Sequence, residues 1–305
     1  MDIQELRIEC ISDLASAEKV WRQFSPNETI YDSWEFRALF HKYHQKEIRF
    51  YVGFVDSVMI GAMPLQYNAQ KGVIEFFGGD YMEDNRIFLL PEYEQYRSKF
   101  YEYLKILKEK FVLEYIRGED EFTKTLEIAD YKYVLPLEGM LTFEDYLQKY
   151  YKSHGRKKLK KKFKDIETLN ICIERNNIKD LETLFSLNIK LFGEHSAFND
   201  RPFHKEIFYE LCQLPYPFFL NVFCLNGEKV GASLALFYNG TMEYFSSGVD
   251  REKVNGLSDY INKTVFEDAL QCKAKFIDAF VGSYGWKEEW HFQKIPQYKF
   301  ITTIE

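Results

Sequence analysis

The sequence predicts a mixed α/β (α+β) protein built from two tandem units, each a mostly antiparallel mixed sheet with flanking helices. Three observations predict this fold class. The chain has 305 residues, enough for two domains of ordinary size. The same order of predicted elements, three strands, a loop, a helix and a strand, occurs twice. The two copies also match residue by residue at several positions.

The first copy begins with helical residues 12–45, whose apolar faces carry Trp21, Trp34 and Phe40. Runs rich in β-branched and aromatic residues then predict strands at 47–56, 58–67 and 72–78. After a loop, apolar residues at helical spacing predict one face of a helix: Tyr96, Phe100, Tyr103, Leu104 and Leu107. Residues 112–118 then predict another strand.

The second copy repeats this order after helical stretches at about 142–169 and 178–192. The pairs Asn226-Gly227 and Asn239-Gly240 are tight-turn signals between its strands. The predicted elements are strands at 216–224, 229–239 and 241–250, a helix at 259–274 and a strand at 275–282.

Short matches between the copies indicate a diverged duplication at an offset of about 170 residues. Ile60-Gly61-Ala62 corresponds to Val230-Gly231-Ala232, and Glu75-Phe76-Phe77 corresponds to Glu243-Tyr244-Phe245. The alternative is that two antiparallel meanders look alike by chance. We expect an N-terminal domain at 1–139 and a C-terminal domain at 140–305.

Composition excludes several classes of protein. Apolar residues make up 46% and charged residues 29%, which is typical of a globular protein with a sizeable core. No apolar run approaches the ~18 residues of a membrane span, and the N-terminus shows no signal peptide. The five cysteines show no metal-ligand spacing, so we expect reduced, buried thiols, a cytoplasmic location and no metal.

Residues 152–164 carry eight Lys or Arg and no acidic residue. Removing these eight charges from the formal net charge of −7 leaves −15, so the rest of the chain would repel a polyanion. On a helix, Leu159, Phe163 and Ile166 form an apolar stripe opposite the lysines, and Ser153 can cap the start. We therefore predict an amphipathic helix with a solvated lysine face rather than a nucleic-acid patch or a nuclear address. A further interpretation is that this lysine face attracts an anionic substrate or cofactor.

The loop between the third strand and the following helix differs between the copies. In α/β proteins such a loop binds phosphates through free N–H groups and the helix dipole. The first copy places Asp80, Glu83 and Asp84 there, which would repel a phosphate. The second reads VDREKVNGLSDY, with positive charge, a glycine that lets the backbone approach closely, and Asn255 or Ser258 as a helix cap. The second copy is therefore expected to be active and the first degenerate.

Three stretches carry a resemblance to a known family: SHGRKKLKKKFKDIE (153–167), GVDREKVNGLSDYI (248–261) and DAFVGSYGWKEEW (278–290). Together with the element order they resemble the GNAT acyltransferase fold, in the FemAB/FemX-like group and its BioF2-like (CelD/BcsL-type) acetyltransferase branch. The chain departs from that pattern at Asn255, where the family has proline, and at Trp286, where it has tyrosine. The resemblance extends over nearly the whole chain.

The resemblance implies transfer of an acyl group from acyl-CoA, most simply acetyl-CoA, to an amine, or alternatively a hydroxyl, of a small or cell-surface-precursor acceptor held between the two domains. It implies that backbone N–H groups of about residues 254–258 bind the pyrophosphate, and that an N–H near residues 247–249 stabilises the thioester oxygen. The cofactor-binding residues expected are Ser247, Gly248, Val249, Arg251, Lys253, Asn255, Gly256, Leu257 and Ser258.

Four residues are candidates for the chemistry. His195, in a polar loop, and Asp278, on the last strand of the second copy, are candidate bases, Tyr284 is a candidate proton donor, and Lys287 is a candidate substrate or phosphate contact. Each also has a purely structural interpretation. Trp286 and Trp290 are expected to pack.

Two other functions are compatible with the sequence. One is a FemX-like transferase that uses aminoacyl-tRNA, with the basic helix facing RNA. The other is a catalytically inactive double-GNAT protein that binds a partner. We expect no DNA partner and no integral membrane segment, and the sequence identifies neither the acceptor nor the oligomeric state.

Overall fold

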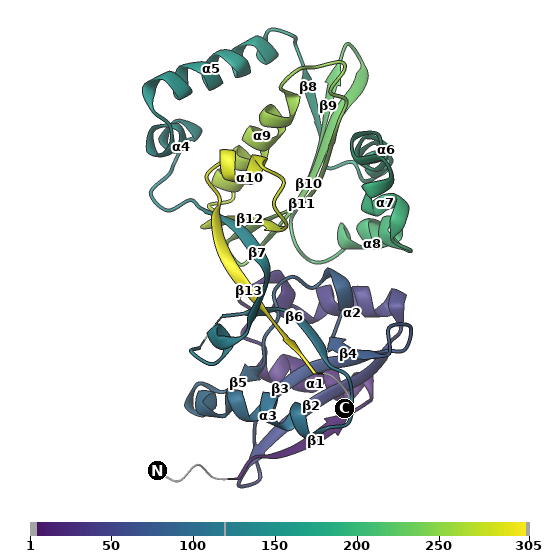
Figure 1. Cartoon of the computed structure of the whole chain (residues 1–305). Coiled ribbons are helices and arrows are strands. Elements are labelled where there is room, and N and C mark those ends of the chain that lie inside the picture. Colours follow the sequence, from purple (N-terminus) through teal and green to yellow (C-terminus); the bar gives the residue numbers. More distant parts are fainter. Residues whose placement is uncertain (1–4, 119, 303–305) are drawn as a thin grey trace. The chain divides into compact units, whose positions relative to one another are not determined.

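The computed structural model describes residues 5–118 and 120–302, apart from the side chain of Asp80. The chain forms two compact units (Figure 1): unit 1 is Met1–Lys132 with Ile295–Glu305, and unit 2 is Tyr133–Lys294. These units differ from the expected 1–139 and 140–305. The boundary falls inside strand β7 (Glu127–Pro136), and the C-terminal segment joins unit 1 because β13 (Gln293–Ile301) pairs with β6 there. The assignment of one domain as degenerate and the other as active stays a prediction.

Unit 1 contains the first predicted copy. Its sheet has the order β1-β2-β3-β4, with β5 added to β3. The bounds of its elements are β1 Arg7–Ile11, α1 Leu14–Phe24, α2 Trp34–His44, β2 Glu47–Val55, β3 Val58–Asn68, β4 Val73–Phe76, β5 Phe88–Leu89, α3 Arg97–Ile106 and β6 Val112–Arg117, with 3-10 helices at Ile30–Asp32, Gly79–Tyr81, Pro91–Tyr96 and Thr123–Thr125.

The helices of unit 1 bury two apolar clusters against its strands. Trp21 of α1 and Trp34 of α2 pack with Phe50 and Phe77 on one face. Phe100 of α3 packs with residues of β3, β4 and β6 in the other cluster. The strand β4 and the start of β6 are parallel, since Ile74 bridges to Phe111. A helix that crosses between two parallel strands is the arrangement predicted from the sequence.

Unit 2 contains the second copy. Its strands have the order β7-β12-β11-β10-β9-β8. The bounds of its elements are α4 Phe143–Tyr150, α5 Ser153–Glu167, β8 Cys172–Arg175, α6 Leu181–Phe192, α7 Ala197–Asp200, α8 His204–Leu211, β9 Phe218–Leu225, β10 Glu228–Tyr238, β11 Thr241–Val249, α9 Leu257–Gln271, β12 Phe276–Val281 and α10 Trp286–Glu289, with 3-10 helices at Ile178–Asp180 and Gly193–His195.

The sheet of unit 2 is covered on both faces (Figure 1). Helix α9 packs on one face, where Leu257, Ile261 and Val265 enter the apolar core. Helix α6 packs on the other face, against β10 and β11. Strands β9, β10 and β11 form an antiparallel meander, and β12 then pairs with β11 in parallel after the α9 crossover.

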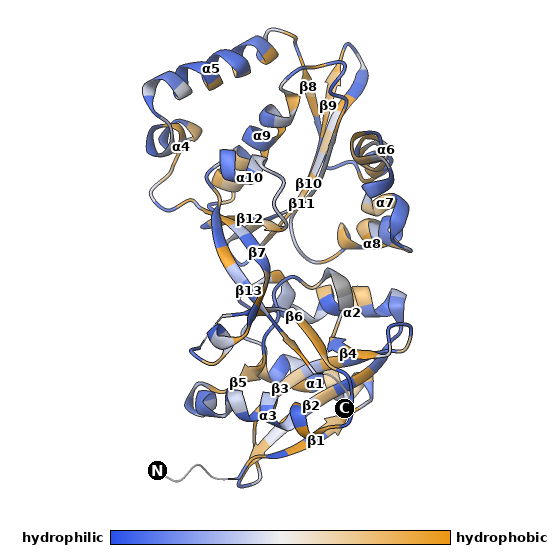
Figure 2. Cartoon of the chain, in the orientation of Figure 1, coloured by the Kyte–Doolittle hydropathy of each residue, from blue (hydrophilic) through white to orange (hydrophobic). Residues whose placement is uncertain are grey.

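The basic run forms α5, as predicted, and Figure 2 shows this helix as largely hydrophilic. Phe163 and Ile166 are buried and Leu159 packs against the core, while Lys157, Lys161 and Lys164 are exposed. The predicted cap is wrong: Lys152 is the N-cap residue, Ser153 is the first helical residue, and no side chain caps the helix.

The cysteines divide between the interior and the surface. Cys212 and Cys224 are buried as expected, but Cys10 and Cys172 are exposed. No helix within the described ranges is long and apolar enough to cross a membrane.

Candidate functional site

The loop from β11 into α9 ends in an uncapped helix N-terminus. Gly256 is the N-cap residue, with φ of +81°, a left-handed conformation that favours glycine. No side chain accepts a hydrogen bond from the first turn, so the predicted caps Asn255 and Ser258 are both wrong. Because the first N–H groups of a helix have no partner within the helix, this end can donate to an anion.

Three lysines, one in this loop and one each on α5 and α6, lie around it, and each is paired with a carboxylate. Lys162 of α5 pairs with Asp259 in the first turn of α9, and its Cε occupies the space that a Cβ on residue 256 would take. Lys253 pairs with Glu228. On α6, Lys190 lies 2.8 Å from Asp250, the residue that follows β11.

Beyond its first three residues, β11 has no pairing with β12. The register joins Thr241–Glu243 to Phe276–Asp278, and β11 then continues to Val249 beside β10 alone. A bulge interrupts the β10–β11 ladder between Tyr244 and Ser246. The irregularity in this strand is therefore at Phe245.

Hydrogen-bond directions alternate along the remaining part of β11. The N–H of Asp250 donates to Val230 O at 2.9 Å, so the alternation of an antiparallel ladder turns the main-chain groups of Ser247 and Val249 away from β10. Asn188 Nδ2 of α6 donates to Ser247 O at 2.7 Å on that side. The strand therefore presents N–H groups of two predicted residues at an edge that β12 does not cover.

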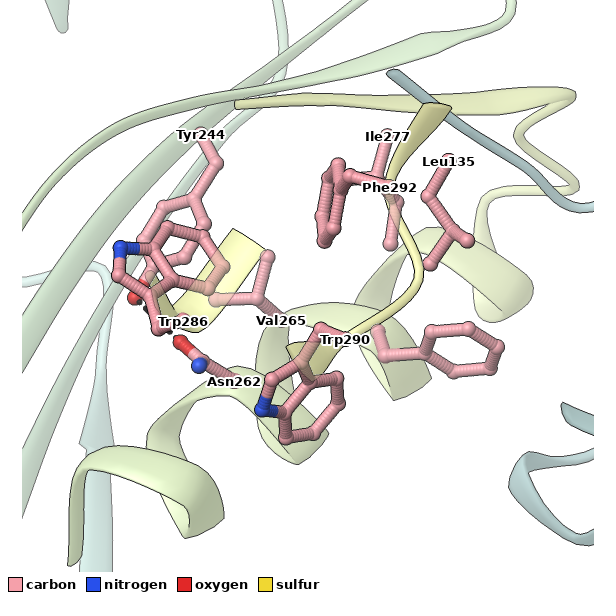
Figure 3. A pocket seen from close by; sticks show the side chains of 9 residues that line it. Leu135, Tyr244, Asn262, Val265, Ile277, Trp286, Trp290 and Phe292 are labelled. Atoms are coloured by element: carbon pink, nitrogen blue, oxygen red, sulfur yellow. Dashed lines mark hydrogen bonds between the residues drawn. The ribbon is translucent and has the colours of Figure 1, made fainter. Parts of the chain in front are cut away.

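A narrow aromatic pocket lies between α9 and the splayed strands (Figure 3). Tyr244 of β11 and Trp286 of α10 form one end, and the Tyr244 hydroxyl donates to Asn262 Oδ1 at 3.1 Å. Burial raises the pKa of Tyr244 to about 12, so its hydroxyl stays protonated at neutral pH. The pocket holds only about 10 Å³ of free space, and its remaining lining is Leu135, Val265, Phe266, Ile277, Trp290 and Phe292.

Two buried carboxylates lie at the point where β11 and β12 separate. Glu243 and Asp278 are register partners and are 1% and 2% exposed. Their neighbours Met242 and Ile277 belong to the core on the α9 face, so the alternation of side chains along a strand places both carboxylates on the opposite face. The sequence indicated Asp278 as a candidate base but did not indicate Glu243. Glu243 was visible in the sequence only as an acidic residue inside an apolar strand.

Asp278 and Lys287 both support a turn at the end of β12. Phe280 has φ of +62°, which is unfavourable for a residue with a side chain. Asp278 Oδ1 accepts a hydrogen bond from Phe280 N at 2.9 Å. The buried ammonium of Lys287 donates to the carbonyls of Val281 and Gly282, each at 2.8 Å. These contacts hold the end of β12 in its turn.

The other predicted residues lie at the surface. The side chain of His195 is 85% exposed and 3.9 Å from Glu194, and Tyr284 is 69% exposed. Tyr284 contacts the Lys287 ammonium, 5.2 Å from its ring centre. Among the cofactor-binding residues, Arg251, Lys253 and Asn255 are exposed, whereas Gly248, Val249 and Leu257 are buried. Over the described part of the chain no three His, Cys, Asp or Glu side chains gather as a metal site would require.

No family model and no curated protein matches this sequence. Solved structures do match. FemX superposes with a TM-score of 0.63 at 13% identity and covers 96% of this chain and 97% of its own. L-PGS from Bacillus licheniformis gives 0.60 at 11%, covering 98% and 93%. A tandem GNAT protein from the clavulanic acid biosynthesis pathway gives 0.56 at 8%, covering 98% of each chain.

At these identities the similarity shows the fold alone. The expected fold class, tandem GNAT-like units with mixed, mostly antiparallel sheets, is confirmed. The similarity does not assign the chain to one group within this fold.

Proposed function

We propose that unit 2 is an acyltransferase that moves an acyl group, most simply acetyl, from acyl-CoA to an amine, and that the chain is nearest in function to the BioF2-like branch of the FemAB/FemX-like group. The observation that carries the proposal is the uncovered edge of β11, which leads directly into the uncapped N-terminus of α9. The GNAT-fold neighbours support it.

The residues around this segment fit the charged part of the donor. The N–H of Leu257 donates to Val254 O at 3.4 Å, so the N–H of Ser258 is the donor that the first turn of α9 offers, and Arg251 and Lys253 add positive charge in the same loop. A pyrophosphate here would also meet Lys162, which would exchange part of its pairing with Asp259 for the phosphate. Bound acyl-CoA would supply an activated thioester.

The edge of β11 fits the reacting carbonyl. When an amine attacks a thioester, negative charge develops on the carbonyl oxygen, and fixed N–H donors stabilise it. The N–H groups of Ser247 and Val249 face the uncovered side of the strand. We assign them this role, with Asn188 holding the Ser247 carbonyl in place.

The aromatic pocket does not select the acyl chain. Its free space is about 10 Å³, room for about one water molecule, so even an acetyl group would have to displace a side chain such as Trp286 to enter it.

The buried carboxylates are the candidate bases. A neutral amine must lose a proton as its nitrogen bonds to the carbonyl carbon and the carbon–sulfur bond breaks. Glu243 and Asp278 adjoin the β11 edge, and we propose that one of them takes this proton. His195 and Tyr284 remain candidates for proton exchange with solvent, given their exposure. We propose that the reaction takes place in the cytoplasm on a small or cell-surface-precursor amine.

The test is thermal unfolding with and without acetyl-CoA. A ligand present at 100 times its Kd stabilises the native state by about 2.7 kcal/mol, so the Tm must rise. Ser258→Glu adds an acid where a helix tolerates it, in the first turn, but repels a phosphate. We expect the rise in wild type and its loss in Ser258→Glu. The matched control is Leu14→Glu, which adds an acid to the first turn of α1 at an exposed site.

One observation favours a second function, transfer from aminoacyl-tRNA. Lys157, Lys158 and Lys161 project from α5 into solvent, and FemX shares the fold. If acetyl-CoA leaves the Tm unchanged while tRNA binds with strong salt dependence, this reading replaces the first. If neither ligand binds, the chain is a partner-binding protein without catalysis.

A further inference from the structure

Unit 1 contains a polar cavity at the position that corresponds to the splayed strands of unit 2. It lies between β4 and β6, which bridge in parallel at Ile74 and Phe111. Ile74, Phe76, Phe111 and Leu113 face the core with α3. The alternation of side chains therefore places Val73 and Glu75 of β4, and Val112 and Glu114 of β6, on the opposite face. All four line the cavity.

Charges of both signs line this cavity, at different positions along the strands. Lys71 and Lys110 precede the two strands, and Glu75 and Glu114 lie four residues further along each strand. At about 3.3 Å per residue the backbone positions of Lys110 and Glu114 are separated by about 13 Å, with Val112 between them, and Lys71 lies in the turn before β4. The cavity thus has a basic end, an apolar floor and an acidic end.

The acidic end is organised before any ligand arrives. Glu75 is 7% exposed, and its Oε1 accepts from Gln66 and from Lys46, with which it forms an ion pair, so Glu114 carries the uncompensated charge at this end. Asn68 Nδ2 donates to Oε2 at 3.2 Å, and a carboxylate oxygen can accept a second hydrogen bond. Among the described residues, neither Glu114 nor Lys110 forms an ion pair, so both charges are open to a ligand.

We propose that this cavity binds a free α-amino acid. Its ammonium group would pair with Glu114 and donate to the Oε2 of Glu75, its carboxylate would meet the long side chains of Lys71 and Lys110, and its side chain would lie on the apolar floor. The cavity volume of about 260 Å³ suits a small ligand such as a free amino acid. This site is separate from the donor site proposed in unit 2 and does not depend on it.

The experiment is calorimetric titration of the full chain with each free amino acid, followed by two derivatives of the tightest one. The methyl ester lacks the carboxylate charge and the N-acetyl form lacks the ammonium charge. A hydrogen bond to a charged group contributes enough to change affinity about tenfold or more. We expect each derivative to bind at least about tenfold more weakly than the parent amino acid.

Two exposed substitutions assign the two ends of the ligand. Lys110→Gln should weaken the parent amino acid about tenfold but leave the methyl ester unchanged, and Glu114→Gln should weaken the parent but leave the N-acetyl form unchanged. Lys108→Gln and Glu102→Gln change exposed charges outside the cavity and are the matched controls. The proposal is overturned if no amino acid binds, or if the bound one is unaffected by the Lys110→Gln/Glu114→Gln double substitution.

Discussion

Two parallel strand pairs among the described residues, β4 with the start of β6 in unit 1 and β11 with β12 in unit 2, differ in how the chain leaves the first strand. After β11, seven residues lead into α9 at Gly256. After β4, the chain instead forms a 3-10 turn, adds β5 to β3, and reaches α3 only at Arg97. A helix N-terminus follows the strand directly in unit 2 and not in unit 1.

Asp84 and Asn85, in the acidic loop of unit 1, have a structural role. Asp84 is buried and pairs with Lys132 at 2.8 Å, and Asn85 bonds to the backbone of Met82 and Glu114. The guanidinium of Arg37, a buried residue of α2, donates hydrogen bonds to the carbonyls of Tyr31, Phe77 and Asp84. Asp84 and Asn85 therefore hold the loop of unit 1 in place, whereas the β11–α9 loop leads directly into a helix N-terminus that no side chain caps. Similar strand pairs can therefore carry different ligand chemistry once the connecting loop has changed.

The strongest way to break unit 1 is Arg37→Ala. The guanidinium donates to Tyr31 O and Phe77 O, each at 2.7 Å, and to Asn85 Oδ1 at 2.8 Å, so its loss leaves several buried acceptors unsatisfied. Burial lowers the pKa of Arg37 to about 10, and it remains charged at neutral pH. We expect a loss of about 4 kcal/mol in the free energy of unfolding, measured by denaturant titration.

Peptide-resolved hydrogen exchange shows which strands lose stability in Arg37→Ala. Exchange should rise in β3–β6 of unit 1 and stay unchanged in β9–β11. The control is Arg22→Ala, which removes an exposed arginine from two surface pairs and should cost less than about 1 kcal/mol. Equal losses for the two variants would contradict the role assigned to Arg37.

Lys132→Met tests the buried pair in the same loop through pH. Burial raises the pKa of Asp84, but the charges of Lys132 and Arg117 outweigh it, and the net pKa is below the usual value. Because the folded pKa is the lower one, the pair stabilises the fold above the unfolded pKa of about 3.9, and this contribution is lost as pH falls through the folded pKa.

Breaking a buried pair costs about 3 kcal/mol at pH 7, so Lys132→Met should be that much less stable. Near pH 4 the gap should narrow, because Asp84 without Lys132 can take up a proton. Urea titration at both pH values measures this. Lys124→Met, which removes an exposed pair with Glu121, should change stability little at either pH. A gap that stays the same at both pH values would rule out the pair as its source.

Local sequence signals predicted most elements of both copies but not how distant segments combine. The strand predicted at 58–67 is β3 at Val58–Asn68, and that at 229–239 is β10 at Glu228–Tyr238. The predicted order did not include β7 or β13, because their partners lie far away in the chain: β13 pairs with β6, well over a hundred residues earlier. Alternating apolar residues indicate a strand but not its partner.

The same limit applies to the candidate site. The β11–α9 loop was predicted because a glycine and basic residues follow a strand, which is a local pattern. The pairing of Lys162 with Asp259 and the burial of Lys287 depend on packing between distant segments. Glu243 carried an acidic signal, but only its register with Asp278 shows that two carboxylates meet there.

A smaller effect is expected from Gly248→Ala, which tests how closely α6 approaches the β11 edge. A Cβ at this position would lie 2.6 Å from the carbonyl carbon of Leu187, so α6 would have to move. Overpacking of this kind costs about 2 kcal/mol. The shift would also weaken the hydrogen bond from Asn188 to Ser247 O, so acetyl-CoA should stabilise the variant less than wild type. Gly155→Ala, inside helix α5, is the control. The new Cβ would lie 3.4 Å from the side chain of Tyr151, which is an ordinary contact, and alanine inside a helix should stabilise the fold by about 0.5–1 kcal/mol. If Gly248→Ala keeps the full response to acetyl-CoA despite its lost stability, the β11 edge does not contact the donor, and the role assigned to the Ser247 and Val249 N–H groups is wrong.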